Sequence, residues 1–452
     1  MGKRTAFDKY LAQLEKAAKV LDLDPRIYAR LQVQARLVRG TVRIEMDDGS
    51  FKEFPVYRCQ HNHARGPTQG GTRFDLAVCE SEIKFLAAMM TMKNAIDDIM
   101  HGGGKGGIRV DKFALSMGER ERLCRGYIRT IAPWIGPRVD GPAPDVGTGA
   151  QEMAWFLDEY ERIIGGEHCF AAFTGKPVVL GGSLGRSDAT ALGAVYATEA
   201  MMNKLGLKGQ QTVAIQGFGN AGDFYAKLMK DRGHTIISVS DRSGTISDPS
   251  GFDLYDLHNF CHDESGKKIR KVTEYPRWDR SIDPLRVALS ADIFAPAAFE
   301  DLIDAHMARE LQSKFIVELA NGPCTEEADE ILAGRGIPVI PDIYASGGGV
   351  RVSAAEKIQG LENQKWPANR VHTWLKDQMF KAFDDLKKTK ERYQLRSLRE
   401  AAMVFAVGAV AEAMAWRGGF EYKYGETIDV PTVTVYKDLS SKGPKLVHRK
   451  SA

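Results

Sequence analysis

The chain contains 452 residues, of which 43% are hydrophobic and 27% are charged. A chain of this length exceeds what one hydrophobic core usually supports, so we expect a globular protein with two domains. The 62 basic residues nearly balance the 59 acidic residues, and the net charge of +3 argues against a protein built to bind nucleic acid or an anionic membrane. The N-terminus lacks the apolar core of a signal peptide and no stretch approaches the length of a membrane span, so we expect a cytoplasmic protein.

Cysteine and histidine spacing does not indicate a metal site. The six cysteines are scattered and form no Cys-x-x-Cys pair, so we expect neither a zinc knuckle nor a disulfide framework. Two histidine pairs, His61 with His63 and His258 with His262, would each share one face of a strand or a helix. Because neither pair has carboxylates or cysteines at metal-ligand spacing, we expect structural or solvent-facing histidines and no bound metal.

The N-terminal part of the chain predicts a helical segment, a β-hairpin and a second helix. Apolar spacing over residues 6–36 is typical of a helix. Residues 41–46 then alternate with period two, an Asp-Gly pair turns the chain, and residues 51–59 return as the second strand. The next helix is expected over residues 81–96, with the hydroxyl of Ser81 as its N-terminal cap.

Lys105 stands within a run of five glycines at residues 102–107. Glycines remove side-chain bulk from around the ammonium, so the backbone and a substrate could close around it and strip away its water. Desolvation lowers a lysine pKa toward the physiological range, which makes Lys105 a candidate acid or base. The alternative is a flexible loop with an exposed lysine. A phosphate-binding P-loop is excluded, because Gly106 stands where that motif needs serine or threonine.

A glycine fingerprint predicts a dinucleotide site. It follows an apolar strand at residues 212–215 and precedes a helical pattern at residues 224–229. The first glycine makes the tight turn, the second lets the backbone approach a pyrophosphate, and the third lets helix pack on strand. A second apolar strand at residues 235–240 ends at Asp241, whose carboxylate would accept hydrogen bonds from the adenosine ribose. The turn itself consists of Gly217, Phe218, Gly219, Asn220, Ala221 and Gly222.

The acid after the second strand bears on which dinucleotide binds. A carboxylate at Asp241 repels the additional phosphate of NADP, which favours NAD. Arg242 beside it could instead clamp a 2′-phosphate, or could point to solvent. We therefore expect NAD as the cofactor, with NADP as the alternative.

Two further helices are expected after the nucleotide unit. That unit begins with a long apolar helix at residues 188–204, and its strands and helices alternate to about residue 345. Helical patterns then cover residues 374–388 and 398–417, and the second consists mainly of Ala, Val and Met. A helix that apolar needs a partner surface, so we expect it to cross back and pack near the first domain. The basic tail beyond it is expected to be mostly a solvated extension.

Several ordered segments of the chain resemble one known family. They lie at residues 66–73, 102–107, 142–147, 181–186, 217–222, 318–323 and 347–353. In order and spacing these segments resemble the glutamate/leucine/phenylalanine/valine dehydrogenases, and within that superfamily the match looks closest to hexameric glutamate dehydrogenase. The resemblance covers roughly residues 10–418.

The resemblance implies an α/β fold of two domains. Residues 1–187 would form an α/β substrate-binding and oligomerisation domain, and residues 188–372 a Rossmann domain that binds NAD(P). Residues 373–420 would be helices that return toward the first domain, followed by a tail at residues 421–452. Family similarity also suggests a homohexamer built through the first domain.

The resemblance also implies roles for individual residues. Lys93 would pair with the substrate α-carboxylate, Lys105 would be the catalytic lysine, and Asp145 would exchange protons with the departing amine. Thr190 and Asn321 would hold the nicotinamide amide and ribose. Further substrate contacts are expected from Gln69, Ala143, Val350 and Ser353, and further cofactor contacts from Arg186, Gly217, Gly219, Asn220, Ala221, Gly222, Asp241, Arg242 and Ala297.

Gln69 departs from the family pattern and bears on the substrate. Glutamate-specific members resemble one another in having a lysine there that neutralises the substrate side-chain carboxylate, and leucine- and phenylalanine-type members have an apolar residue. Loss of that charge-assisted bond costs on the order of 1 kcal/mol or more, whereas an apolar substrate would leave the glutamine amide unpaired. Ser353, at the place of a serine that also contacts the carboxylate, supports glutamate. Arg351 could replace the missing charge, but in a helix it would point away from the face that Val350 and Ser353 share.

We therefore predict an oxidoreductase that catalyses reversible NAD(P)-dependent oxidative deamination of an L-amino acid, with L-glutamate, 2-oxoglutarate and ammonia as the expected reactants. Its partners would be these small molecules rather than nucleic acid or membrane. Two alternatives stay open: a sister enzyme for another amino acid, for example one with a neutral polar side chain, and a non-catalytic nucleotide-binding regulatory relative. Retention of Lys93, Lys105 and Asp145 argues against the regulatory relative.

Overall fold

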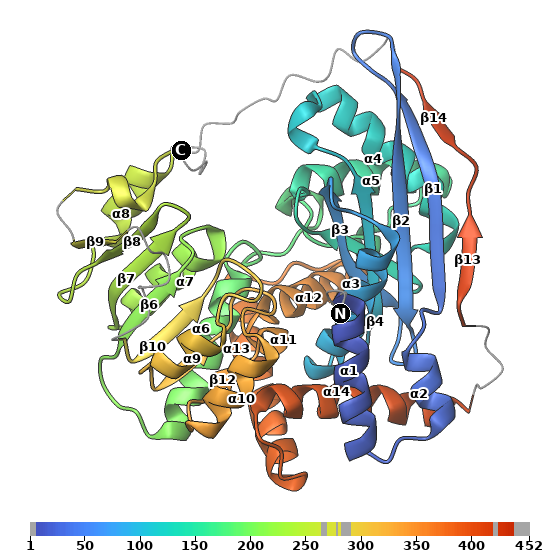
Figure 1. The fold of residues 1–452 in the computed structure, drawn as a ribbon. Helices are drawn as coiled ribbons and strands as arrows, with labels where there is room; N and C mark the ends of the chain where they lie inside the picture. The colour runs from blue at the N-terminus through green and yellow to red at the C-terminus, as the bar shows by residue number, and fades with distance from the viewer. Residues whose placement is uncertain (1–5, 264–268, 277–278, 282–290, 419–423, 438–452) are drawn as a thin grey trace.

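The computed structural model describes residues 6–263, 269–276, 279–281, 291–418 and 424–437. It contains two β-sheets, each of seven strands, with helices packed on their faces (Figure 1). The predicted α/β fold class, with an N-terminal unit and a nucleotide-binding type of unit, is therefore confirmed. Within the described ranges, none of the helices is both long and apolar enough to cross a bilayer.

The first sheet is built from the N-terminal strands, in the order β13-β1-β2-β4-β3-β5, with β14 also beside β1. The pairs β1–β2 and β2–β4 are antiparallel, whereas β3 runs parallel to both β4 and β5. Alternate side chains of the strands enter two apolar clusters, one shared with α4 and α5 and the other with α3. The bounds are β1 Arg36–Glu45, β2 Phe51–Asn62, β3 Thr68–Asp75, β4 Gly102–Arg109, β5 Asp140–Pro144, α3 Glu80–Ile96, α4 Met117–Ile131 and α5 Ala150–Ile163.

The predicted helix over residues 6–36 is wrong in its length. The chain forms α1 over Ala6–Val20 and a separate helix α2 over Pro25–Leu31, and β1 has already begun at residue 36. The break occurs because the side chain of Asp24 caps α2, whose first residue is a proline. The hairpin that follows is confirmed, although both of its strands are longer than predicted.

The predicted hydroxyl cap of α3 is also wrong. The helix begins at Glu80, its N-cap is Cys79, and that residue makes no side-chain capping bond. The hydroxyl of Ser81 instead lies 3.3 Å from the Cys79 sulfur. Two acidic residues in the first turn favour the helix N-terminus electrostatically in place of a cap.

The glycine run is a buried central strand, β4, and the alternative of a flexible loop is wrong. Its glycines allow close packing rather than mobility. A Cβ on Gly103 would lie 2.2 Å from the backbone nitrogen of Thr91 in α3, and one on Gly106 would lie 2.1 Å from the hydroxyl of Tyr127 in α4. Helices therefore press on both faces of the strand that carries Lys105.

The second sheet has the order β12-β11-β10-β6-β7-β8-β9, with its first five strands parallel. The strand–turn–helix predicted around the glycine fingerprint is confirmed as β6, α7 and β7. The strands are β6 Thr212–Gln216, β7 Thr235–Asp241, β8 Gly244–Ser247, β9 Asp279–Ser281, β10 Ile293–Pro296, β11 Phe315–Val317 and β12 Val339–Ile340. The helices are α6 Ala189–Leu205, α7 Asn220–Asp231, α8 Leu254–Cys261, α9 Ala305–Glu310, α10 Glu326–Gly334, α11 Asp342–Ala345 and α12 Gly348–Glu362.

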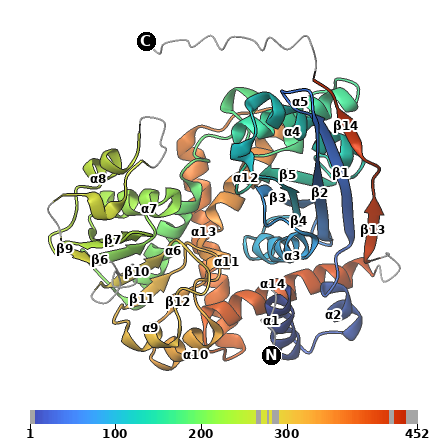
Figure 2. The ribbon, with the colours of Figure 1, turned by 45° about the horizontal axis from the view of Figure 1, so that its top comes forward.

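The last helices join the two units, as predicted. Helix α13 (Ala368–Arg392) packs beside α6, and α14 (Leu398–Arg417) packs against both α3 and α1 of the N-terminal unit (Figure 2). At the start of α14, Arg399 donates to Glu318 and Asp329, both at 2.5 Å. The apolar helix thus has the partner surface that its composition requires.

The basic tail predicted to be a solvated extension lies, apart from Lys437, outside the described residues, but the segment before it, residues 424–437, is part of the first sheet. Strands β13 (Glu426–Asp429) and β14 (Val433–Val435) pair in parallel with β1 (Figure 2). An ion pair of 2.9 Å between Arg36 and Glu426 adds to the ladder. The edge of β1 provides backbone donors and acceptors, and the paired segment brings Glu426 and Asp429 beside Arg36 and Arg39 of that strand. The remainder of the tail lies outside the described residues.

Candidate active site

Lys105 lies in the middle of β4 and is paired with Asp145. Its Nζ is 2.9 Å from Oδ2 of Asp145, which follows the end of β5. Lys105 is only 6% exposed, whereas the Asp145 side chain is 20% exposed. The two predicted catalytic residues are therefore brought together, one in the sheet and the other at the edge of the site.

Arg73 completes this charged group and was missed by the sequence analysis. Its Nε lies 2.9 Å from the same oxygen of Asp145, and its Nη1 lies 2.6 Å from Glu82 of α3. Arg73 is the last residue of the segment at residues 66–73, and nothing in its local sequence indicates a partner 72 residues away. Its position in β3 could have indicated the contact, because β3 pairs in parallel with both β4, which carries Lys105, and β5, which precedes Asp145.

Burial and mutual charge set the protonation of this group. Burial is the main effect that lowers the pKa of Lys105, although the charge of Asp145 opposes it and that of Arg73 adds to it. Burial alone would raise the pKa of Asp145, but Lys105 and Arg73 together hold it below its ordinary value. The arrangement keeps a carboxylate ionised beside a lysine that gives up its proton more readily than usual.

Lys93 links the two units at the predicted site. It lies in the last turn of α3, and its Nζ is 3.0 Å from Ser346 Oγ and 3.3 Å from Asn321 Oδ1. Both partners belong to the unit that carries the second sheet. The Lys93 ammonium therefore reaches Asn321 in the second unit, and its charge also contributes to lowering the pKa of Lys105.

The predicted substrate residues come from both units. Gln69 and Ala143 are buried on the paired strands β3 and β5, and Val350 and Ser353 share a face of α12. The amide nitrogen of Gln69 lies 3.2 Å from Thr174 Oγ1, while its Oε1 is buried and unpartnered within the described chain. Thr174 was not predicted, and only its place beside β5 reveals it.

Arg351 does not supply a charge to this region. It is fully buried, and its Nη1 lies 2.8 Å from Oδ1 of Asp97 at the end of α3. It thus points away from Val350 and Ser353, as the helical spacing predicted. Compensation for Gln69 by Arg351 is excluded by this geometry.

The glycine turn between β6 and α7 fits a dinucleotide. Gly217 has a φ of 103°, which favours glycine, and a Cβ on Gly222 would lie 2.0 Å from the Gly217 carbonyl. By contrast, a Cβ on Gly219 would meet no atom within 4 Å. Close packing therefore fixes the first and third glycines, and the space beside the second leaves room for a pyrophosphate at the N-terminus of α7, where Asn220 and Ala221 begin the helix.

Other predicted cofactor residues surround the same edge of the second sheet. Ala297 follows β10, and its N–H donates to the Gln216 carbonyl at 2.6 Å. Thr190 is in the first turn of α6, close to α12: a Cβ on Gly349 would lie 2.7 Å from Thr190 Oγ1 and 3.5 Å from Arg186 Nη1. Arg186 is half-buried, and burial lowers its pKa. These contacts place both side chains where α6 meets α12.

Asp241 ends β7, as predicted, and is held by its own loop. Its carboxylate accepts hydrogen bonds from the N–H of Ser243 at 2.8 Å and from the N–H of Val272 at 3.1 Å. Arg242 is exposed, with its guanidinium 5.4 Å from the ring centre of Phe299. The carboxylate is therefore fixed in orientation, whereas Arg242 lies along the surface.

The histidine pairs occupy structural settings. His61 is buried and bonds Thr91 and the Leu31 carbonyl, and His258 stacks on His262 with ring centres 4.5 Å apart. In the described part of the chain, the group with metal-ligand spacing is Glu318, Cys324 and Asp329. Arg399 already donates to both of those carboxylates, so this group serves the joint with α14.

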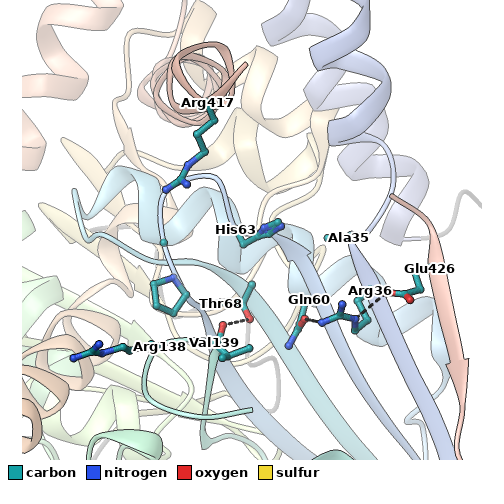
Figure 3. Close-up of a pocket in the computed structure, with 11 residues that line it drawn as sticks. Ala35, Arg36, Gln60, His63, Thr68, Arg138, Val139, Arg417 and Glu426 are labelled. Atoms are coloured by element: carbon teal, nitrogen blue, oxygen red, sulfur yellow. Dashed lines mark hydrogen bonds and ion pairs between the residues drawn. The ribbon is translucent and has the colours of Figure 1, made fainter. Parts of the chain in front are cut away.

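A cavity of about 450 Å³ lies apart from these residues (Figure 3). It opens near the ends of β1 and β2 and is bordered by the last residue of α14, Arg417, whose guanidinium donates to the Ala64 carbonyl. Arg36 in its wall is already paired with Glu426. Because none of the predicted site residues lines it, the chemistry of the Lys105 region does not extend into this cavity.

A dinucleotide-type turn in one α/β unit and a buried lysine–aspartate pair in the sheet of the other are typical of an oxidoreductase of the Rossmann type. Two family models match the chain: "Glutamate/Leucine/Phenylalanine/Valine dehydrogenase" over residues 181–418, and "Glu/Leu/Phe/Val dehydrogenase, dimerisation domain" over residues 34–162. The chain therefore belongs to the Glu/Leu/Phe/Val dehydrogenase family, which confirms the resemblance given above.

Relatives of known identity agree with this assignment. A glutamate dehydrogenase of Thermotoga maritima is 41% identical over 420 residues, which are 92% of this chain and 99% of the relative. The crystal structure of a glutamate dehydrogenase from Peptoniphilus asaccharolyticus superposes with a TM-score of 0.82 at 33% identity, covering 92% of this chain and all of that one. The hetero-hexameric enzyme of Thermus thermophilus, in a leucine-bound form, gives a TM-score of 0.84 at 34% identity, with coverages of 92% and 98%. The protein is an NAD(P)-dependent amino acid dehydrogenase of the glutamate dehydrogenase type.

Proposed function

We propose that the protein catalyses the reversible oxidative deamination of L-glutamate to 2-oxoglutarate and ammonia. The observation that carries the proposal is the buried Lys105–Asp145 pair, 2.9 Å apart, in a chain 41% identical to a glutamate dehydrogenase. A lysine with a lowered pKa beside an ionised acid can exchange protons with an amine and a water molecule. The nicotinamide of the bound dinucleotide would supply the acceptor for the substrate hydride.

Each side chain of the site has a role in this proposal. Lys93 binds the α-carboxylate of the substrate and orients its α-carbon. Lys105 accepts a proton from the water that attacks the iminium carbon, and Asp145 moves protons between the amine nitrogen and solvent. Arg73 holds the Asp145 carboxylate in place through its 2.9 Å contact. Water exclusion between the two units would favour the hydride step.

The remaining substrate and cofactor assignments are part of the same proposal. Gln69, Ala143, Val350 and Ser353 would contact the substrate side chain. Arg186, Thr190, Ala297 and Asn321 would border the nicotinamide half of the cofactor, and the turn at residues 217–222 its pyrophosphate. The fixed Asp241 carboxylate supports NAD over NADP, since it would accept from the ribose hydroxyls and repel a 2′-phosphate.

The oligomeric state, the domain boundaries and the cellular location are also proposals. A hexamer is supported by the likeness to the hetero-hexameric enzyme of Thermus thermophilus, and identical subunits are proposed from the family resemblance alone. Domain boundaries after residues 187, 372 and 420 stay proposals from the sequence, and the one at residue 372 falls inside α13. A cytoplasmic location likewise stays a prediction.

A panel of L-amino acids, assayed with NAD and with NADP by nicotinamide absorbance, tests the proposed function. L-glutamate with NAD is expected to give the highest kcat/KM. Gln69 favours a second candidate, an enzyme for an amino acid with a neutral polar side chain, because its free amide oxygen would accept from such a group. Preference for glutamine or another neutral residue would support that candidate, and lack of turnover with every amino acid would leave a regulatory relative.

Gly219→Ala is expected to weaken dinucleotide binding by tenfold or more without lowering the thermal unfolding midpoint, since 1.4 kcal/mol of lost contact corresponds to tenfold. The added methyl meets no protein atom within 4 Å, so the fold accepts it, but it occupies the space where the pyrophosphate would approach. Titration of the protein with NADH, followed by its fluorescence, measures the affinity.

Gly334→Ala is the matched control, because it too places a methyl in open space, at the end of α10. It should leave the affinity unchanged. Equal affinity of Gly219→Ala and the wild type would contradict the placement of the pyrophosphate at this turn.

A further inference from the structure

Lys357 is a buried lysine that no role described above uses. It lies in α12, one turn after Ser353 and two turns after Val350, so the three side chains share one face of the helix. Lys357 is only 3% exposed, and its Nζ has no hydrogen-bond partner among the described residues. A lysine that has lost water without gaining an acceptor is costly, so such a group calls for an explanation such as a ligand.

Gln69 supplies a second unpartnered polar atom. Its amide nitrogen lies 3.2 Å from Thr174 Oγ1, and its buried Oε1 has no partner in the described ranges. The oxygen and nitrogen of an amide exchange places on a flip, so the Thr174 hydroxyl can donate to the oxygen instead. In that orientation the Gln69 NH₂ group takes the unpartnered position and can donate to an anion.

Strand register and electrostatics relate Lys357 to the strands on either side of Gln69. Gln69 is paired across the first sheet with a glycine of β4 on one side and a glycine of β5 on the other. His101 just precedes β4, and its pKa is lowered chiefly by burial and then by the charge of Lys357. Asp140 is the first residue of β5, and it opposes the burial that lowers the pKa of Lys357 to about 8. His101 and Asp140, which both interact with the Lys357 charge, thus lie at the starts of the two strands on either side of β3.

Glu356 anchors α12 over this part of the first sheet. Its carboxylate accepts from the Gly175 N–H at 2.8 Å and pairs with Lys176 at 2.5 Å, and both side chains of that pair are fully buried. Thr174, the partner of Gln69, immediately precedes these residues. The segment of residues 174–176 therefore contacts both Gln69 and the turn of α12 that carries Lys357.

Asp140 is not itself the missing partner of Lys357. Arg58 donates to both of its oxygens, at 2.7 and 2.5 Å, so the carboxylate is already neutralised. A negative charge from outside the chain would meet the unpaired Lys357 and the donor groups of Ser353 and Gln69. Three donors converging on one anion is the pattern that binds a carboxylate.

We propose that Lys357 is the specificity-determining residue that binds the side-chain carboxylate of the substrate, supplying the positive charge that Gln69 lacks. The inference rests on the proposed function, since it takes an acidic amino acid held at its other end by Lys93. Ser353 and the flipped Gln69 amide donate to the same carboxylate. The charge that selects the substrate then comes from α12 rather than from β3.

The test compares L-glutamate with L-norvaline, which has the same carbon chain without the side-chain carboxylate. Lys357→Met is expected to lower the ratio of kcat/KM for glutamate over norvaline by roughly 10- to 100-fold, the usual effect of losing a charge-assisted bond. Methionine has a similar length and removes an unpaired buried charge, so the unfolding midpoint should stay the same or rise. The shift of that midpoint by 2-oxoglutarate gives the same comparison without turnover.

Rescue and control variants separate specificity from general damage. Gln69→Lys in the Lys357→Met background is expected to restore much of the glutamate preference, which a merely structural role of Lys357 would not allow. Lys365→Met, an exposed lysine just beyond α12, should change nothing. If wild type prefers glutamate and Lys357→Met keeps that ratio, the inference alone is overturned. If wild type prefers neutral amino acids, the proposed substrate is overturned and the inference with it.

Discussion

Replacing Lys105 with methionine is expected to lower kcat by roughly 10²- to 10⁴-fold, the usual loss when a positioned acid–base group is removed. The side chain is buried in the middle of β4, and its ammonium lies 2.9 Å from Asp145. Methionine fills the same space but carries no proton, so the water that attacks the iminium carbon loses its base. Steady-state turnover of L-glutamate measures kcat, and dinucleotide affinity should be unchanged because the glycine turn belongs to the other sheet.

Two further variants test whether the loss of kcat comes from the proton that Lys105 transfers. Lys52→Met changes an exposed lysine of the neighbouring strand β2 and should leave kcat unchanged. Lys105→Arg keeps the positive charge but cannot become neutral, so it should be nearly as inactive as the methionine variant. Because burial lowers the pKa of Lys105, kcat/KM of the wild type should rise with pH as the ammonium loses its proton. If Lys105→Met kept the kcat of the wild type, Lys105 would not be the catalytic base.

Arg58→Met is expected to destabilise the protein by about 3–5 kcal/mol, the usual cost of removing one partner from a buried ion pair. Arg58 and Asp140 are both fully buried in the first sheet, joined by contacts of 2.7 and 2.5 Å. Without the guanidinium, Asp140 keeps only the 3.2 Å contact from Gln60 among the hydrogen bonds described. Urea denaturation at a fixed protein concentration measures the change in the free energy of unfolding.

The same substitution at an exposed arginine of this sheet serves as the control. Arg43 of β1 is exposed and lies over the ring of Phe51, so Arg43→Met should cost less than about 1 kcal/mol. Combining Arg58→Met with Asp140→Leu should recover part of the loss, because no unpaired charge then stays buried. A small effect of Arg58→Met alone would mean that solvent or a partner group reaches Asp140.

Local patterns predicted the nucleotide unit well. The glycine turn, the strand before it and the acid at Asp241 are set by short-range sterics and hydrogen bonding, which the sequence carries directly. Helix α14 was predicted with the bounds that it has in the structure, because its mostly apolar run lies between the capping residue Ser397 and Gly418. Elements that depend on a few adjacent residues can therefore be predicted from the sequence alone.

Elements that depend on distant partners were not predicted. The glycine run has no side-chain pattern of its own, and it forms a strand because β2, β3 and two helices close around it. The tail pairs with β1 only because the fold leaves that edge free. Thr174 and Arg73 lie 105 and 72 residues from their partners in the site. Sequence spacing contains no trace of such contacts.

The sequence by itself determined the family, the dinucleotide turn and the identity of Lys93, Lys105 and Asp145 as candidates, since each follows from residues at short or ordered spacing. Tertiary structure alone decided which charges meet. It buried Arg351 against Asp97, set Arg73 on Asp145 and left Lys357, on the face of Ser353, without an acceptor among the residues that the structure describes. The reason is physical: the energy of a charge depends on its burial and on neighbours brought from far along the chain, and only the folded packing fixes both.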